Sequence, residues 1–409
     1  MIDLCKGTLA CLVLGVLVAA CGASSKRSGD QDGEGGKGSS STSSSGTGAQ
    51  GGLALSSSSG EGGGGILKTE PPCEGDHTNL DDDKDGFTGG QGDCNDCTKQ
   101  MNPGALDYAG NNIDEDCNGA PDDTPTNCDG ALAVESQDPM DGARAMGLCK
   151  QAGGTGWGVV SAKYSKADGS PGQDPLGNGI LSGFGPMVHP QEGAKVFAVS
   201  SGAARQPTDP NYQDPGGYDK GYVSGCPAGY PKEFPGCPGV VTGEPHDSHA
   251  LTLKIRTPTN AKSLRFAFDF YTWEFPVYIC SMFNDYFVAM LSPKLANLPD
   301  GNISFDKQGN TISVNAGFLE VCAPQQAGGK NFPCELGPAA LGGTGFEEHA
   351  ATGWLETSAP VDSPGSEIEL MFAAWDSGDG ILDSTVVIDD FRFEVEETPT
   401  GTVHIPDPK

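Results

Sequence analysis

Basic residues are scarce in this chain, where 24 Lys and Arg stand against 55 Asp and Glu and give a formal net charge of −31 at pH 7. Such an excess of negative charge repels the phosphates of nucleic acids and of anionic lipids, and it attracts cations. The composition therefore excludes DNA and RNA as expected partners. Long apolar runs are scarce as well. The one extended run, at residues 9–20, is too short to cross a bilayer as a mature helix.

That short apolar run ends at residues 18–21, whose sequence is Val-Ala-Ala-Cys. A short apolar region followed by small residues is typical of a secretory signal peptide. With the cysteine at its end, the pattern resembles the lipobox of bacterial lipoproteins. This resemblance implies a signal peptide over residues 1–20, acylation of Cys21 as the membrane anchor and, because Gly22 follows, the outer membrane as destination. An ordinary signal peptide cut near Ala20 is the alternative.

The composition divides the remaining chain into segments. Residues 22–65 hold 15 Gly and 13 Ser in 44 positions and cannot bury a core, so we expect a flexible tether over residues 21–69. Residues 70–123 hold 15 acidic residues, two lysines and four cysteines, which predicts a small disulfide-bonded module over residues 70–124. A main domain over residues 125–396 and a C-terminal tail over residues 397–409 complete the expected organisation.

The main domain shows short β-rich segments separated by Gly and Pro, with little helical periodicity. In residues 264–270, Leu and Phe alternate with Arg, Ala and Asp, which predicts a strand with one face in the core and the other face polar. Further strands are expected at residues 158–162, 196–200, 250–255, 285–291, 311–314, 367–374 and 385–395, and a helix at residues 141–151. Many short strands separated by turns predict an all-β fold of the β-sandwich or jelly-roll kind.

Cysteine is abundant, since 11 of the 14 cysteines lie beyond residue 21. This density is typical of proteins in an oxidising compartment and predicts disulfides. Short separations along the chain predict three local bridges, namely Cys128 with Cys149, Cys226 with Cys237, and Cys322 with Cys334. Cys280 is then the expected odd thiol. The pairing among Cys73, Cys94, Cys97 and Cys117 stays open.

Asp81, Asp83 and Asp85 alternate in a short segment that is followed by a glycine. Alternation in a tight loop directs carboxylates inward, and a glycine permits the sharp turn that a calcium loop requires. An EF-hand would have Glu at position 92, where this chain has Gly, so Asp93 is expected to complete the ligand shell. The segment therefore predicts a calcium site. Asp114, Asp116 and Asn118 repeat the spacing and predict a second one.

The runs at residues 81–86, 92–96, 102–104 and 112–119 together resemble the metal-binding motif named after MopE and, more loosely, thrombospondin type-3 calcium repeats. The resemblance implies one folded calcium unit with Ca²⁺ as its cofactor. Cys97 departs from the motif. Two alternatives remain open: a zinc site at Cys94 and Cys97, or a merely solvated acidic stretch.

A second resemblance covers the main domain. The segments at residues 269–276, 280–287, 302–306, 318–322, 343–346, 352–355 and 375–391 are similar, in order and spacing, to the choice-of-anchor L domain of bacterial surface proteins. This implies an exported, surface-tethered β-domain without a defined molecular activity. Because the tail shows neither an apolar helix nor a sorting motif, Cys21 is the expected anchor.

Asp376, Asp383 and Asp390 lie before or in the last expected strand of the main domain and are candidate ligands of a second metal. The ending resembles that of jelly-roll carbohydrate-binding modules, in which a carboxylate of the terminal strand often holds structural calcium. The alternative is a turn in which these aspartates cap backbone amides.

The expected function is that of a calcium-stabilised surface lipoprotein, without an organic cofactor, whose β-sandwich serves adhesion or binds a ligand such as a glycan. No catalytic residue is assigned. Five aromatic residues form either a sugar-stacking platform or part of the core, namely Tyr271, Trp273, Tyr278, Trp354 and Trp375. The competing hypotheses are a polysaccharide hydrolase that uses Glu274, Asp285 or Glu320, and a purely structural envelope component.

Overall fold

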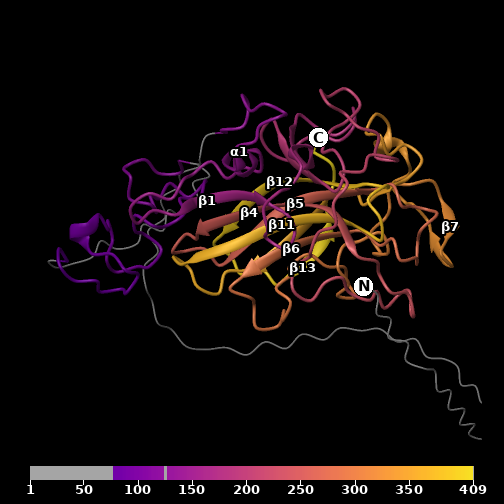
Figure 1. Ribbon diagram of the computed structural model, residues 1–409. Helices are drawn as coiled ribbons and strands as arrows, with labels where there is room; N and C mark the ends of the chain where they lie inside the picture. The colour runs from indigo at the N-terminus through magenta and orange to yellow at the C-terminus, as the bar shows by residue number, and fades with distance from the viewer. Residues whose placement is uncertain (1–76, 124–126, 409) are drawn as a thin grey trace, which may run out of the picture. The chain divides into compact units, whose positions relative to one another are not determined.

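The computed structural model describes residues 77–123 and 127–408 (Figure 1). The expected signal peptide, Cys21, the tether and Cys73 lie outside the described residues. Within the described residues, no helix is both long enough and apolar enough to span a membrane.

Two antiparallel sheets form the main domain (Figure 1). The first contains, in order, β1 (Gly158–Ser165), β4 (Pro245–Arg256), β11 (Glu367–Ser377) and β6 (Tyr286–Ser292). The second contains β13 (Gly401–His404), β10 (Leu355–Pro360), β5 (Ser263–Thr272), β12 (Ser384–Glu394), β3 (Val196–Ser200) and β2 (Asn178–Leu181), and β9 (Ala350–Ala351) pairs with β5. The predicted all-β sandwich is confirmed.

Short elements connect and cover the two sheets. They are helix α1 (Pro139–Ala145), the hairpin of β7 (Gln325–Ala327) and β8 (Lys330–Phe332), and the 3₁₀ turns η1 (Gly89–Gln91), η2 (Pro175–Gly177) and η3 (Ala339–Leu341). The helix is shorter than the expected residues 141–151. It begins after Asp138, whose side chain accepts the amide of Met140, and it stops before Gly147, whose φ of 92° is not helical.

The core lies between the two sheets. Phe266 of β5 packs edge-on against Phe372 of β11, with ring centroids 4.9 Å apart, and Phe268 contacts Phe287 of β6 at the same distance. This arrangement confirms that alternate residues of β5 face the core. The opposite face of β5 was expected to be polar, and this holds at Arg265, which is half-buried and pairs with Glu356. Asp269 and Tyr271 are nevertheless buried there, and Tyr271 belongs to a second apolar cluster whose other members come from strands and loops both before and after β5.

Three further differences separate the expected elements from the observed ones. Residues 311–314 form isolated bridges instead of a strand. The expected tail supplies β13, which pairs with β10 at the edge of the second sheet. The acidic segment packs on the turn between β4 and β5, where the amide of Thr259 donates to the carbonyl of Gly104 (3.0 Å) and the amide of Leu106 donates to Asn260 (2.8 Å). Tertiary hydrogen bonds therefore join segments that the composition separates.

Four disulfides are resolved among the described residues, namely Cys94–Cys117, Cys128–Cys149, Cys237–Cys280 and Cys322–Cys334. The expected bridges at Cys128 and at Cys322 are present. The expected pairing of Cys226 with Cys237 is wrong, because Cys237 pairs with Cys280 across 43 residues. Cys226, not Cys280, is the free thiol among the described residues. Tertiary packing here overrides the short separation along the chain.

Peptide mapping of the unreduced protein should therefore recover a peptide that joins Cys237 to Cys280. Iodoacetamide should label Cys226 slowly, since burial raises the pKa of its thiol and lowers the thiolate fraction. Replacement of both Cys237 and Cys280 by Ser should lower the free energy of unfolding by about 4 kcal/mol, the loop-closure value for a loop of this length. A Cys226–Cys237 peptide would contradict the observed pairing.

Candidate calcium site

The first acidic loop begins at Asp81, and backbone amides later in the loop donate hydrogen bonds to the Asp81 carboxylate. Asp81 accepts hydrogen bonds from the amides of Asp85 (3.1 Å) and Gly86 (3.2 Å), and Asp83 also accepts from the amide of Asp85 (3.0 Å). Lys84 and Gly86 have left-handed φ values of 66° and 101°, which allow the tight turn. The alternating aspartates therefore form a tight turn that is held by hydrogen bonds from its own backbone amides.

The second acidic loop has the same hydrogen-bond pattern. Asp114 accepts from the amides of Asn118 (3.0 Å) and Gly119 (2.8 Å), and Asp116 accepts from the amide of Asn118 (3.3 Å). Cys117 has a φ of 57° at the position that corresponds to Lys84. The two loops are a structural repeat, joined by the Cys94–Cys117 disulfide.

Carboxylates from two chain segments, residues 81–85 and 93–96, converge at the first loop. Oxygens of Asp81, Asp83 and Asp85 lie within 4.8 Å of one another, and so do oxygens of Asp83, Asp93 and Asp96. Asp83 belongs to both groups, so five carboxylates surround one region. Four of them, Asp83, Asp85, Asp93 and Asp96, each keep one buried oxygen without a hydrogen-bond partner. Oxygen atoms of this kind are the ligands that calcium prefers.

Electrostatics favours a cation at this position. Burial raises the pKa of Asp83, of Asp93 and of Asp85, the last to about 6, and the negative charges of neighbouring aspartates raise each pKa further. A divalent cation would offset both effects and keep the carboxylates ionised. Calcium affinity should therefore fall as the pH drops below about 6, where protons compete for Asp85.

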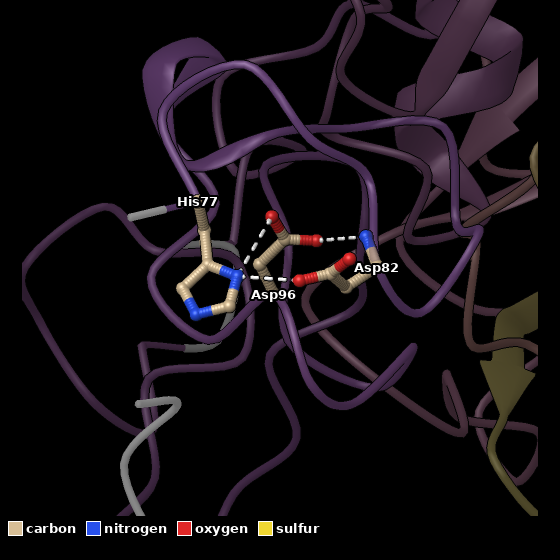
Figure 2. Close-up of side chains that lie close together, drawn as sticks. All are labelled: His77, Asp82 and Asp96. Carbon is tan, nitrogen blue, oxygen red and sulfur yellow. Dashed lines mark hydrogen bonds and ion pairs between the residues drawn. The ribbon is translucent and has the colours of Figure 1, made fainter. Parts of the chain in front are cut away.

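Asp96 was not among the predicted ligands, and it connects the acidic group to a histidine (Figure 2). Figure 2 shows the His77 ring facing two carboxylates: its Nδ1 lies 2.6 Å from Asp82 and 3.9 Å from Asp96. The other oxygen of Asp96 accepts the amide of Asp82 (2.8 Å). Asp96 thus fixes the start of the loop as well as facing Asp83. Its place in the Asp-Cys-Asn-Asp run was the available sequence signal.

The second loop gathers a different set of carboxylates from the expected one. Oxygens of Asp107, Asp116 and Asp123 lie within 4.8 Å of one another. Asp114 and Asn118 are instead occupied by backbone amides, with Asn118 accepting from Ala120 (2.8 Å). Lys150 already lies 3.2 Å from Asp116 and partly neutralises it. The first loop is therefore the better cation site.

The candidate metal ligands of the main domain separate in space. Asp376 is the penultimate residue of strand β11 and Asp383 precedes strand β12, and both are 1% exposed. Asp390 lies toward the other end of β12, at a bulge, and forms an ion pair with Arg392. The structure therefore does not bring Asp390 to the other two aspartates, because six residues of strand β12 intervene between Asp383 and Asp390.

The residues proposed for hydrolysis or for sugar stacking are mostly enclosed. Glu274 and Asp285 are 2% and 0% exposed, and Glu320 pairs with His404 (3.2 Å). Three of the five aromatic candidates, Tyr271, Trp354 and Trp375, are buried in apolar clusters, whereas Trp273 and Tyr278 are half-buried. Core packing accounts for the buried rings.

Comparisons with known proteins give little further information. No protein-family description and no curated protein matches the chain. The chain is similar to a solved structure described as the K2 cleaved adhesin domain of Lys-gingipain (Kgp), with 15% identity over 57% of this chain and 88% of that chain. The TM-score of this likeness is 0.23, too low to support an inference about function.

Replacing Asp83 by Asn should weaken calcium binding more than any other single change in the first loop, since Asp83 faces both groups of carboxylates. We expect an affinity loss of about tenfold or more, because affinity follows the number of charged ligands. Isothermal titration of the wild type, Asp83→Asn and the exposed control Asp362→Asn measures it. Equal affinities for all three would refute the site.

Proposed function

We propose that this chain is an exported, lipid-anchored, calcium-binding protein whose β-sandwich presents a surface for adhesion or ligand binding. The observation that carries the proposal is the convergence of Asp81, Asp83, Asp85, Asp93 and Asp96 in a loop whose amides are already satisfied while carboxylate oxygens stay unpaired. Such a loop is stable only when a cation offsets the repulsion.

Calcium would act here as a structural element. The acidic segment buries few apolar side chains, chiefly Phe87 and Ala105, while Leu80 is 57% exposed. Burial alone therefore contributes little to its folding. A bound ion stabilises the folded form by about 2.7 kcal/mol when free calcium is a hundred times the dissociation constant. Millimolar extracellular calcium satisfies that condition for sites of moderate affinity.

The folded acidic segment would in turn stabilise the β-sandwich through its contacts with the turn between β4 and β5. A Cβ atom built on Gly104 would lie 3.0 Å from the ring of Phe87 and 3.0 Å from the methyl group of Thr259, so the backbone at Gly104 packs closely against both, and Thr259 donates its hydroxyl proton to Asn102 (2.8 Å). These contacts hold the turn between β4 and β5, which belong to different sheets. Calcium binding should therefore raise the stability of the whole domain.

The loops at one end of the sandwich are the proposed binding surface. The segments that precede β4, join β5 to β6 and join β11 to β12 expose apolar side chains, namely Val241 (83%), Val277 (76%), Met282 (46%) and Ile381 (46%). The amide of Gly243 donates to the carbonyl of Met282 (2.8 Å), which places two of these loops together. Exposed apolar groups on neighbouring loops suit the binding of a partner or a glycan.

Ligand binding can be tested with the soluble fragment that starts at Cys73, on a glycan array and on a panel of envelope components. Val277→Ser combined with Met282→Ser should reduce binding, whereas Val403→Ser should not, because Val403 is 50% exposed on the edge strand β13. Binding that the loop changes leave intact would place the ligand elsewhere. Absence of any ligand would favour the structural envelope role.

Lipid attachment can be tested on the full chain in cells. We expect a palmitate analogue to label the wild type and Cys21→Ala to move from the membrane to the soluble fraction, because acyl chains supply about 0.8 kcal/mol of membrane affinity per buried methylene. Cys226→Ala is the control, since it removes a described thiol without touching the anchor. A wild type that takes up no label would refute the lipid anchor and leave the calcium proposal standing.

A further inference from the structure

Several strand ends from both sheets meet beneath the proposed binding loops. β11 ends at Ser377, and after six intervening residues β12 begins at Ser384 in the other sheet. Strand β6 pairs with the end of β11, and β3 pairs with the start of β12. Asp285, Asp376 and Asp383 lie at these ends, and each is no more than 1% exposed. Three carboxylates are therefore buried where the two sheets join.

Both carboxylate oxygens of Asp285 accept hydrogen bonds from protein donors, whereas those of Asp376 and Asp383 do not. One oxygen of Asp285 accepts the amide of Ser377 (3.0 Å) and the other accepts the hydroxyl of Ser384 (2.7 Å). None of the four carboxylate oxygens of Asp376 and Asp383 accepts a hydrogen bond from an N–H or hydroxyl donor within the described residues, although all four are buried, and the carboxyl group of Asp376 lies within hydrogen-bonding reach of Asp285. Buried carboxylates are normally paired or bound to a metal, because desolvation is costly.

The nearest alternative partners are committed elsewhere. The hydroxyl of Ser201 lies beside Asp376 but donates to the carbonyl of Ser384 (3.2 Å). Lys220 is the buried ammonium that acts on both carboxylates, yet two of its three protons go to the carbonyls of Ser200 (2.9 Å) and Asp247 (3.1 Å). One ammonium also cannot balance the buried carboxylates that surround it.

The carboxylate of Asp383 fills the space that a side chain at position 202 would need. Gly202 follows strand β3, and a Cβ atom built on it would lie 1.8 Å from Oδ2 of Asp383 and 2.0 Å from its carboxyl carbon. Any side chain at position 202 would therefore displace the carboxylate. Ser200 already donates its hydroxyl proton to the carbonyl of Ser384 (3.1 Å), so the segment is held closely against β12.

We propose that Asp376 and Asp383 bind a calcium ion at the junction of the two sheets, with the negative charge of Asp285 beside it. The neighbouring donors are carboxylates, hydroxyls and carbonyls, which suit a hard cation. Two carboxylates with all four oxygens available can each chelate, and bidentate chelation suits calcium better than the octahedral shell of magnesium. Asp390, the third residue expected from the sequence, has no part in this site because Arg392 neutralises it.

This ion would fix the loop between β11 and β12, which exposes Ile381 in the proposed binding surface. In that respect the inference deepens the proposed function, and it rests on that function only for the role of the loop. The presence of the ion is independent of the acidic loops, since no residue is shared. The two sites can therefore fail separately.

The test compares calcium stoichiometry of the full mature chain by equilibrium dialysis and elemental analysis. The variants are the wild type, Asp376→Asn/Asp383→Asn, Asp83→Asn and the exposed control Asp362→Asn. We expect the double variant to bind one calcium ion fewer than the wild type and Asp362→Asn to bind the full number. When the double variant is combined with Asp83→Asn, the two reductions in bound calcium should add. An unchanged stoichiometry in the double variant would overturn the inference without affecting the acidic loops.

Because the double variant removes buried charge and its folding can suffer, two further measurements decide the matter. Gly202→Ala keeps every charge but should lower occupancy of this site alone, since the added methyl group displaces Asp383. Wild-type crystals grown in calcium should show an anomalous-scattering peak between Asp376 and Asp383. No peak there, or a magnesium ion in its place, would overturn the calcium assignment, and a shared proton between buried carboxyl groups would then explain their burial.

Discussion

The structure depends on how an excess of carboxylates is neutralised when basic residues are scarce. In the acidic loops, backbone amides do part of this work: Asp81 and Asp114 each accept two amides and thereby set the loop conformation. Amides satisfy only some oxygens, however, and Asp83, Asp85, Asp93 and Asp96 keep buried oxygens without partners. Where arginine and lysine are few, a divalent cation is the remaining source of compensating charge.

Carboxylates of the β-sandwich must also be neutralised or hydrogen-bonded, and different carboxylates have different partners. Glu356 lies between Arg265 (2.8 Å) and Arg392 (2.6 Å) at the partly exposed outer surface of the second sheet. Asp269 is buried and is held by the hydroxyl groups of Tyr271 (2.7 Å) and Thr352 (3.0 Å). Burial raises the pKa of Asp269 to about 7, so its ionised form is tolerated only because both hydroxyls donate to it. Asp376 and Asp383 lack either solution.

The repeat within the acidic segment shows how one backbone design supports two electrostatic outcomes. Both loops share the pattern of amide donors and the left-handed residue at their fourth position. In the first loop Asp83 meets Asp93 and Asp96, whereas in the second loop Asp116 meets Lys150 as well as Asp107 and Asp123. The conformation is local, but the occupancy of each site is decided by the residues that other segments bring.

The sequence by itself determined the local features of this protein. Alternation in β5 and the carboxylate spacing from Asp81 to Asp85 act over a few residues, so the strand and the loop could be predicted from neighbours alone. The same holds for Cys322 and Cys334, 12 residues apart. Short-range steric and hydrogen-bonding preferences suffice for such features.

Only the tertiary structure decided which distant groups meet. Cys237 pairs with Cys280 rather than Cys226, Asp96 joins the first loop, and Asp390 is separated from Asp383 along β12. Part of the outer face of β5 is buried because segments before and after it in the chain cover it, and the alternation within β5 carries no information about that contact. Each of these outcomes depends on the packing of segments far apart in the chain, and such contacts are set by the free energy of the whole fold instead of by any local pattern.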